Sequence, residues 1–342
     1  MKIHFDSKEF LKVFRLVKTA APKASITPTL RYIKVQTDKK GVILQATDTK
    51  HGIQIHVDAD VSEPGDALLP IKKVIEALGT AKGFRATIES TKEGIKVINA
   101  ESLMTWHFAC EESKFPQIPR FTAKSYHEID AEDMLAMIRR TTFAVEKIKK
   151  DDNYRLNGVC FENEGDILHA VATDGKRLAI QKVTGKSKKN HTFEERETII
   201  PVNALQLLEK CLKELPKSSV IKIALVKGNA HKIIFQYGAA TIFAELIKGL
   251  FPKWRSIIPS VSFMHKVTIS NDALKLALKN LAPLFSKTDP HVDLVFAPNR
   301  LTLNAMVAKT PYKGSKKEKR GTIEIACDCD ITGTLQTHLG LL

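Results

Sequence analysis

The sequence predicts an α+β protein built from three tandem copies of one unit, in which two helices pack on antiparallel sheet. A repeat is the first observation behind this fold class. The segment "ATDTKHGIQI" at 46–55 returns as "ATDGKRLAI" at 172–180, and an amphipathic helix followed by an alternating strand precedes each copy. The length of the repeat is the second, because a unit of this size carries enough helix and strand to close its own core.

The first unit opens with a helix and then a strand. Asp6 followed by Glu9 has the spacing of a helix N-cap. The segment 30–36 predicts a strand before the first Ala-Thr-Asp, and Pro70 is expected at the first position of a second helix. The apolar faces expected on these two helices are Phe10, Val13, Phe14 and Val17, and then Ile71, Val74, Ile75 and Leu78.

The second unit repeats this order and a third one begins it again. Asp130 is expected to cap a helix, 155–165 to form a strand, and Pro201 to open a second helix; Ser270 begins the helix of the third unit, before a strand pair at 292–307. The predicted domains are 1–124, 125–262 and 263–342. Inward-facing residues are predicted at Met134, Leu135, Ile138, Leu205, Leu208, Leu212, Leu215, Leu274, Ala277, Leu278 and Leu281.

Composition narrows the class of protein. The 342 residues are 43% hydrophobic, and the five cysteines are scattered without a Cys-x-x-Cys pair, which argues against a disulfide framework or a zinc site. We therefore expect no metal and no cofactor. The first residues have no apolar signal-peptide core, and no apolar run reaches transmembrane length, so a cytoplasmic protein is expected.

The charge points to a polyanionic partner. Lys and Arg number 53 against 38 Asp and Glu, a formal net charge of +15, and nucleic acid is the default partner for such an excess. The alternative is a basic surface that only keeps the protein in solution. Basic residues recur on the expected helices at Lys8, Lys12, Arg15, Lys72, Lys73, Arg139, Arg140, Lys210, Lys213, Lys275 and Lys279.

Catalytic motifs are missing from the sequence. It contains no phosphate-binding loop, no Gly-x-Ser-x-Gly and no His-Glu-x-x-His. Asp48 and Asp174, each in an Ala-Thr-Asp at a strand end, are better explained as turn residues than as metal ligands. We therefore expect a binding protein and not an enzyme.

Two longer segments carry a resemblance to a known family. The segment "YRLNGVCFENEGDILHAVATDGKRLAI" at 154–180 and "LIKGLFPKWRSIIP" at 246–259 resemble the bacterial DNA sliding clamps, the beta subunits of DNA polymerase III. The resemblance implies the DNA-clamp fold and a head-to-tail homodimer that closes a ring around duplex DNA. It also implies a processivity factor in the nucleoid that meets polymerase III and the clamp loader through short peptides.

The resemblance also implies two sets of site residues. Sequence-independent contact with DNA is expected from helix residues and from the basic loop 146–154. The DNA-binding residues are Lys12, Lys23, Arg139, Lys147, Lys149, Lys150, Tyr154, Arg155 and Lys213. The partner-peptide pocket is expected at Leu156, Thr173, Gly175, Lys176, Arg177, Leu178, Pro252 and Ile257.

Some features depart from the family pattern. The chain is basic throughout, the third unit is shorter than the second, and Asp289 stands where an aromatic pocket residue is expected. The sequence therefore predicts an incomplete peptide pocket. It leaves open an incomplete clamp paralogue, of the kind a mobile element carries, that binds DNA or a host clamp. The segment "QTHLGLL" at 336–342 resembles the peptides that clamps bind, although a shortened helix of the third unit is the favoured interpretation.

Overall fold

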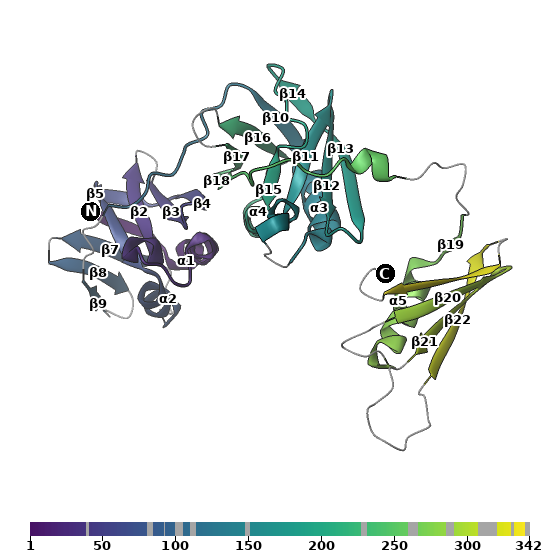
Figure 1. The fold of residues 1–342 in the computed structure, drawn as a ribbon. Coiled ribbons are helices and arrows are strands. Elements are labelled where there is room, and N and C mark those ends of the chain that lie inside the picture. The colour runs from purple at the N-terminus through teal and green to yellow at the C-terminus, as the bar shows by residue number, and fades with distance from the viewer. Residues whose placement is uncertain are drawn as a thin grey trace. The chain divides into compact units, whose positions relative to one another are not determined.

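The computed structural model describes residues 1–38, 41–80, 85–91, 93–99, 105–109, 114–147, 151–226, 231–258, 266–284, 291–306, 320–329 and 332–338. The chain forms two compact units, Met1–Pro252 and Lys253–Leu342 (Figure 1). None of the helices in the described ranges is long and apolar enough to cross a membrane.

The first unit holds two modules of the same element order, each with nine strands and two α-helices among its described residues. The first module contains β1 (Lys2–Asp6), α1 (Ser7–Val17), β2 (Tyr32–Asp38), β3 (Gly41–Thr47), β4 (His51–Val57), β5 (Asp60–Glu63), β6 (Asp66–Pro70), α2 (Ile71–Thr80), β7 (Arg85–Thr91), β8 (Gly94–Asn99) and β9 (Thr105–Phe108). Short 3₁₀ turns η1 (Lys18–Ala20) and η2 (Pro28–Arg31) join α1 to β2.

The second module repeats that order after a linker. It contains β10 (Tyr126–Asp130), α3 (Ala131–Thr141), β11 (Gly158–Glu164), β12 (Ile167–Thr173), β13 (Leu178–Thr184), β14 (Lys186–Lys188), β15 (Ile199–Pro201), α4 (Val202–Glu214), β16 (Val220–Val226), β17 (Lys232–Tyr237) and β18 (Ala240–Glu245), with η3 (Thr142–Ala144) and η4 (Asp151–Leu156) after α3. The predicted caps are confirmed, since Asp6 and Asp130 each accept two backbone N–H groups at the start of their helices.

Antiparallel pairing joins the two modules into one sheet. The nine-stranded sheet runs β14-β10-β16-β17-β18-β4-β3-β2-β6, so β18 of the second module lies directly beside β4 of the first. Two further sheets, β5-β1-β7-β8-β9 and β13-β12-β11-β15, complete the unit. Gly52 on β4 is needed at the junction, because a Cβ there would lie 2.5 Å from the Phe243 ring.

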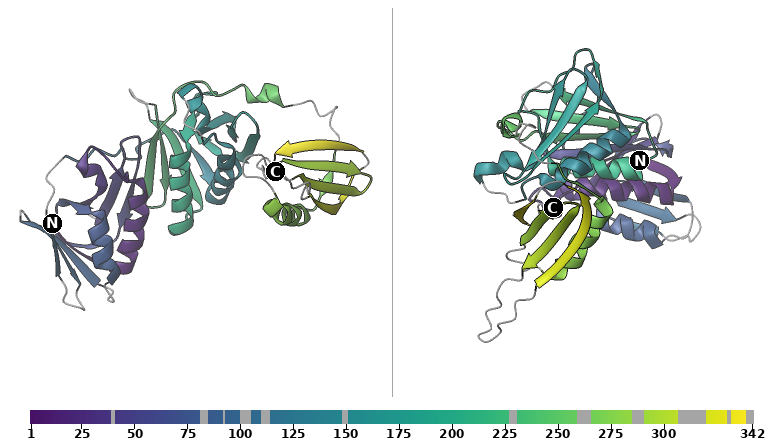
Figure 2. Two further views of the ribbon diagram at one scale, coloured as in Figure 1. Left: turned by 60° about the horizontal axis from the view of Figure 1, so that its bottom comes forward. Right: turned by 90° about the vertical axis from the view of Figure 1, so that its right-hand side faces the viewer.

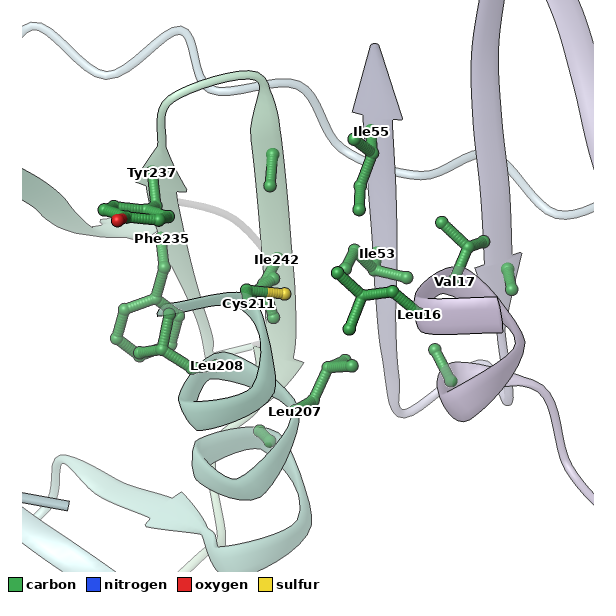
Figure 3. Close-up of a cluster of buried hydrophobic side chains, with 14 of the residues drawn as sticks. Leu16, Val17, Ile53, Ile55, Leu207, Leu208, Cys211, Phe235, Tyr237 and Ile242 are labelled. Atoms are coloured by element: carbon green, nitrogen blue, oxygen red, sulfur yellow. The ribbon is translucent and has the colours of Figure 1, made fainter. Parts of the chain in front are cut away.

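Helix packing reinforces this junction. Leu16 of α1 and Leu207 of α4 point toward each other between the modules, near Ile53 of β4 and Ile242 of β18 (Figure 3). All four side chains are at most 3% exposed. Burying apolar side chains of this size stabilises a fold by about 1.5–3 kcal/mol each, so the junction is part of the core.

The second unit repeats the first half of a module. It contains η5 (Trp254–Ile257), β19 (Thr268–Ile269), α5 (Asn271–Leu281), η7 (Ala282–Leu284), β20 (His291–Ala297), β21 (Arg300–Met306), β22 (Arg320–Asp328) and β23 (Gly333–His338). Its sheet order is β19-β22-β21-β20-β23, and the pairing of β23 with β20 matches that of β15 with β11. Ser270 caps α5 as the sequence predicts.

Three expectations need correction. Residues Gln336–His338 form part of strand β23, so the helix expected at 336–342 is wrong there, and the last four residues lie outside the described ranges. Pro201 is the N-cap of α4 and Pro70 ends β6, so both prolines precede their helix instead of opening it. The fully buried α3 positions include Met137 at 0% exposure, whereas Leu135 is only half-buried, because Met137 shares the stripe of Met134 and Ile138.

Candidate functional site

The four helices of the first unit form one row. Neighbouring contacts run α2 to α1, α1 to α4, and α4 to α3, and the other views of the ribbon show α1 and α4 side by side at the module junction (Figure 2). The helices carry nine basic residues against six acidic ones: Lys8, Lys12, Arg15, Lys72, Lys73, Arg139, Arg140, Lys210 and Lys213 against Glu9, Glu76, Glu132, Asp133, Glu209 and Glu214. All nine basic side chains are exposed. The row is therefore a basic surface of modest net charge.

An acidic residue that sequence reasoning missed joins two of the predicted DNA-binding residues. Glu209 of α4 accepts from Arg139 Nε at 3.1 Å and from Lys213 Nζ at 2.6 Å. The bonds from Lys213 and Arg139 together outweigh burial and lower the pKa of Glu209. Arg139 is on α3, so the shared carboxylate fixes the two helices' basic groups beside each other.

The loop expected to touch DNA is anchored at both ends. The Glu146 N–H donates to the Leu156 carbonyl at 3.0 Å, and Asn157 Nδ2 donates to the Glu146 carbonyl at 2.7 Å. Lys147, Tyr154 and Arg155 are exposed at this anchor. Lys149 and Lys150 lie outside the described residues, and Lys12 and Lys23 are exposed on α1 and after η1.

The second Ala-Thr-Asp forms a tight, fully bonded turn between β12 and β13. Thr173 Oγ1 donates to the Arg177 carbonyl at 2.7 Å and accepts the Gly175 N–H at 3.0 Å. Asp174 Oδ1 accepts the N–H groups of Lys176 and Arg177 at 3.0 and 3.1 Å, and Arg177 Nε donates to Asp174 Oδ2 at 3.0 Å. Burial raises the pKa of Asp174, but these donors outweigh it and leave that pKa below its ordinary value.

The first Ala-Thr-Asp makes the same bonds 126 residues earlier. Thr47 Oγ1 donates to the His51 carbonyl at 2.7 Å and accepts the Thr49 N–H at 2.9 Å. Asp48 Oδ1 accepts from Lys50 and His51 N–H groups at 2.9 and 2.8 Å, and its Oδ2 lies 3.0 Å from His51 Nδ1. The repeated sequence is therefore a turn first, as predicted, and any special role of the second copy comes from the side chains it presents.

Those side chains differ between the copies. Arg177 stands where the first turn has His51, and its guanidinium lies over the Phe143 ring at 5.5 Å from the centroid. Phe143 is 52% exposed, which is unusual for a large aromatic. Phe143 was not predicted as a site residue from the sequence. An aromatic residue just after a helix that ends in basic residues could have indicated it. Lys176 is exposed, Leu178 is half-buried, and Leu156 and Thr173 are each 8% exposed.

The segment leading to Pro252 is held against the same module. Arg196, whose φ is +61°, donates through Nε to the Phe251 carbonyl at 2.6 Å, and its own carbonyl accepts the Phe251 N–H at 2.8 Å. A Cβ on Gly249 would lie 3.4 Å from Tyr154 Oη, so this segment passes beside the anchored loop. Pro252 is thereby fixed near that loop. Ile257 belongs to the second unit, where it is 62% exposed in η5.

The thiols and carboxylates in the described part of the chain form no site of their own. Burial raises the pKa of the Cys160 and Cys211 thiols, so both are protonated at neutral pH and unreactive. Within the described ranges, no three His, Cys, Asp or Glu side chains are grouped so that they could hold a metal ion.

The sequence and structure comparisons with known proteins agree with one another. The sequence profile of the DNA polymerase III beta subunit, central domain, matches residues 128–253. The beta sliding clamp of Chlamydia pneumoniae is 24% identical over 309 residues, covering 90% of this chain and 81% of that protein. Among solved structures, sliding clamps from Bartonella birtlesii and Bacillus subtilis match with TM-scores of 0.82 and 0.83 at 20% and 18% identity, covering 98% and 99% of this chain and 86% and 87% of theirs.

The structural likeness establishes the fold, and the sequence comparisons show a similarity to the same proteins. The profile match falls on the second module, which holds the Arg177 turn and the anchored loop. The resemblance inferred from 154–180 and 246–259 is thus confirmed. Residues 128–253 thus match the central domain of the DNA polymerase III beta subunit, and the chain is similar to bacterial beta sliding clamps over 90% of its length.

Proposed function

We propose that this chain is a DNA sliding clamp, a processivity factor without a catalytic site of its own, which encircles duplex DNA and tethers DNA polymerase III. The single observation that carries the proposal is the row α2-α1-α4-α3 beside the strand junction β4–β18. A row of helices with exposed Lys and Arg meets phosphates but inserts no element to read bases. Such contacts are sequence-independent and weaken with salt, which permits sliding.

The way the two modules join suggests how a ring closes. The contact inside the chain combines strand pairing with packing between Leu16 and Leu207. Strands β9 and β13 end their sheets, so each offers an edge with no strand partner in the described part of the chain. We propose three clamp domains, 1–124, 125–262 and 263–342, repeated head to tail in two chains. Exposed edges of this kind are normally paired or covered, and further module contacts would cover them.

The partner site is proposed around the second turn. Leu156 and Leu178 supply apolar surface, while Thr173, Gly175, Lys176 and Arg177 supply backbone and charged groups, and Pro252 borders them. An apolar slot with a few fixed polar groups suits a short extended peptide from a polymerase or clamp loader. The bonded turn supports this role, because a rigid site loses little conformational entropy on binding.

The size of the particle in solution tests the proposal. Light scattering should give twice the mass of one chain without DNA, and the same dimer bound to nicked circular plasmid. An incomplete clamp paralogue predicts a different result, a single chain that gains mass only when a second clamp is added. A monomer at all concentrations, on and off DNA, would exclude the ring.

A further inference from the structure

The face of the nine-stranded sheet opposite the helices carries charged residues that do not belong to the helix row. In the second module, α3 and α4 cover the face of the sheet to which the strand residues Ile129, Ile223 and Phe235 belong. The strand register places the alternate residues on the other face: Lys188 pairs with Tyr126, and Glu128 pairs with Lys186 on one side and Lys222 on the other. Three lysines and a tyrosine therefore surround one carboxylate away from the helices.

Two more lysines extend this surface. Lys124 precedes β10 and Lys189 follows β14, and both are exposed. We call Lys124, Lys186, Lys188, Lys189, Lys222 and Tyr126 the outer patch. Glu128 lies 3.9 Å from Lys188 Nζ, and Asp130, on the same face of β10, caps α3. Asp166, on the turn beside β14, lies 3.5 Å from the Ser187 N–H.

The ratio of charges distinguishes this surface from the helix row. Five lysines against three carboxylates is a slightly larger relative excess than nine basic against six acidic residues. Lysines this close repel each other, and an opposite charge bound among them relieves the repulsion. The outer patch therefore offers a second basic surface to a polyanion.

Aromatic side chains border the lysines. The Lys222 ammonium lies 5.2 Å from the centre of the Tyr126 ring, and the Phe121 ring meets that ring edge-on at 5.9 Å. Phe121 belongs to the linker segment 114–123, which packs Phe115 and Ile118 on the apolar part of the same face. The segment runs from the first module toward β10 (Figure 1). Lysines bordered by half-buried aromatic side chains are typical of sites that bind single-stranded nucleic acid. The lysines bind its phosphates, and an unpaired base stacks on an aromatic ring.

We propose that the outer patch binds single-stranded nucleic acid, without sequence preference, on the face of the sheet opposite the helices. The proposal does not depend on ring closure, because every residue of the patch belongs to one module. Single-stranded nucleic acid would then be a second ligand of this basic chain, besides the duplex DNA proposed for the helix row. An acidic protein is the competing occupant, but it would not use the aromatic border.

Lysine footprinting tests the site directly. The full-length protein is acylated with an amine-reactive reagent, with and without a 20-residue oligothymidylate, and the modified lysines are identified by mass spectrometry. We expect at least threefold protection of Lys186, Lys188 and Lys222 by the single strand. The same protection by a blunt duplex or by polyglutamate would contradict a single-strand site, and no protection would remove the site altogether.

Charge-matched variants provide the second arm. The outer triple variant carries Lys186→Gln, Lys188→Gln and Lys222→Gln. The control triple carries Lys50→Gln, Lys182→Gln and Lys248→Gln, three exposed lysines outside the patch and the helix row. Each lost phosphate contact lowers the log–log salt slope for a single strand by about 0.7, so the outer triple should lose about 2 units of slope. Equal losses in both triples would show that only net charge matters, and the proposal would be wrong.

Discussion

Thr49 and Gly175 occupy the same position in two copies of one turn, with φ of +79° and +84°. In each copy the residue follows the Asp whose Oδ1 accepts the next two N–H groups. The turn thus requires a left-handed residue, which glycine adopts freely and threonine adopts at a cost. The first copy keeps a strained threonine, and the second has the residue that the geometry favours.

Exchanging these residues should have unequal effects on stability. Gly175→Thr should lower the free energy of unfolding by about 1–2 kcal/mol, the usual cost of a left-handed non-glycine residue. Thr49→Gly should change it by less than about 1 kcal/mol, because relief of strain is offset by the entropy of the unfolded chain. Urea unfolding followed by circular dichroism measures both. Equal destabilisation by the two substitutions would contradict a shared turn.

The module junction should behave as one packed contact. Leu16→Ala and Leu207→Ala should each destabilise the first unit by about 2–4 kcal/mol, as expected for a buried leucine. The double variant should lose less than the sum, because the two side chains face each other and the second truncation opens a cavity that already exists. Lys12→Ala on the exposed side of α1 is the control and should change stability little. Strict additivity would show that the leucines do not share a contact.

Two buried histidines should make stability depend on pH. His191 Nε2 accepts the Leu225 N–H at 3.2 Å, so its proton is on Nδ1, which donates to His127 Nδ1 at 2.9 Å. Burial and the neighbouring His127 lower the pKa of His191 to about 4, and burial lowers that of His127 against the opposing effect of Asp166. Protonation of His191 at Nε2 loses the bond from the Leu225 N–H, and protonation of His127 at Nδ1 loses the bond between the two rings.

The sign of this dependence follows from the lowered pKa values. The unfolded chain takes up protons near pH 6.5 and the folded chain only near pH 4, so the stabilisation is complete above pH 6.5 and is lost as the pH falls toward 4. The loss for His191 is on the order of 3 kcal/mol. Unfolding measured from pH 7.5 to 4 should show it, and His191→Gln should flatten the curve between pH 6.5 and 5. An unchanged curve in that variant would assign the pH dependence to the carboxylates.

The partner pocket can be tested with its own internal control. Arg177→Ala should weaken binding of a fluorescent Gln-x-x-Leu-x-Phe peptide by roughly fivefold or more, equivalent to about 1 kcal/mol. His51→Ala removes the equivalent side chain from the first turn and should leave peptide affinity unchanged. Fluorescence anisotropy measures both. An equal effect of the two substitutions, or none for Arg177→Ala, would place the peptide elsewhere.

The fold could be predicted from the sequence because its signals are local and repeated. Asp6, Asp130 and Ser270 cap helices as expected, since an N-cap needs only a few adjacent residues. The strand at 336–338 was missed because its identity depends on pairing with β20, some 40 residues earlier, which no local pattern records.

The site was predicted less completely than the fold. The turn at 173–177 follows from its residues, but Glu209 between Arg139 and Lys213, and Phe143 under Arg177, depend on which helix faces which strand. The same limit applies to Leu16 and Leu207, which lie off the main apolar stripe of their helices. They are buried only because the two modules meet there.

The central claim is tested most directly by comparing how long the protein stays on circular DNA and on the same DNA after it has been cut. The protein is loaded on nicked circular plasmid at a salt concentration that prevents binding through phosphate contacts alone, and the plasmid is then cut once. A closed ring predicts that the protein stays on the circle and leaves within minutes of linearisation, because it slides off the new ends. Equal retention on circular and linear DNA would contradict encirclement, and with it the account of this chain as a sliding clamp.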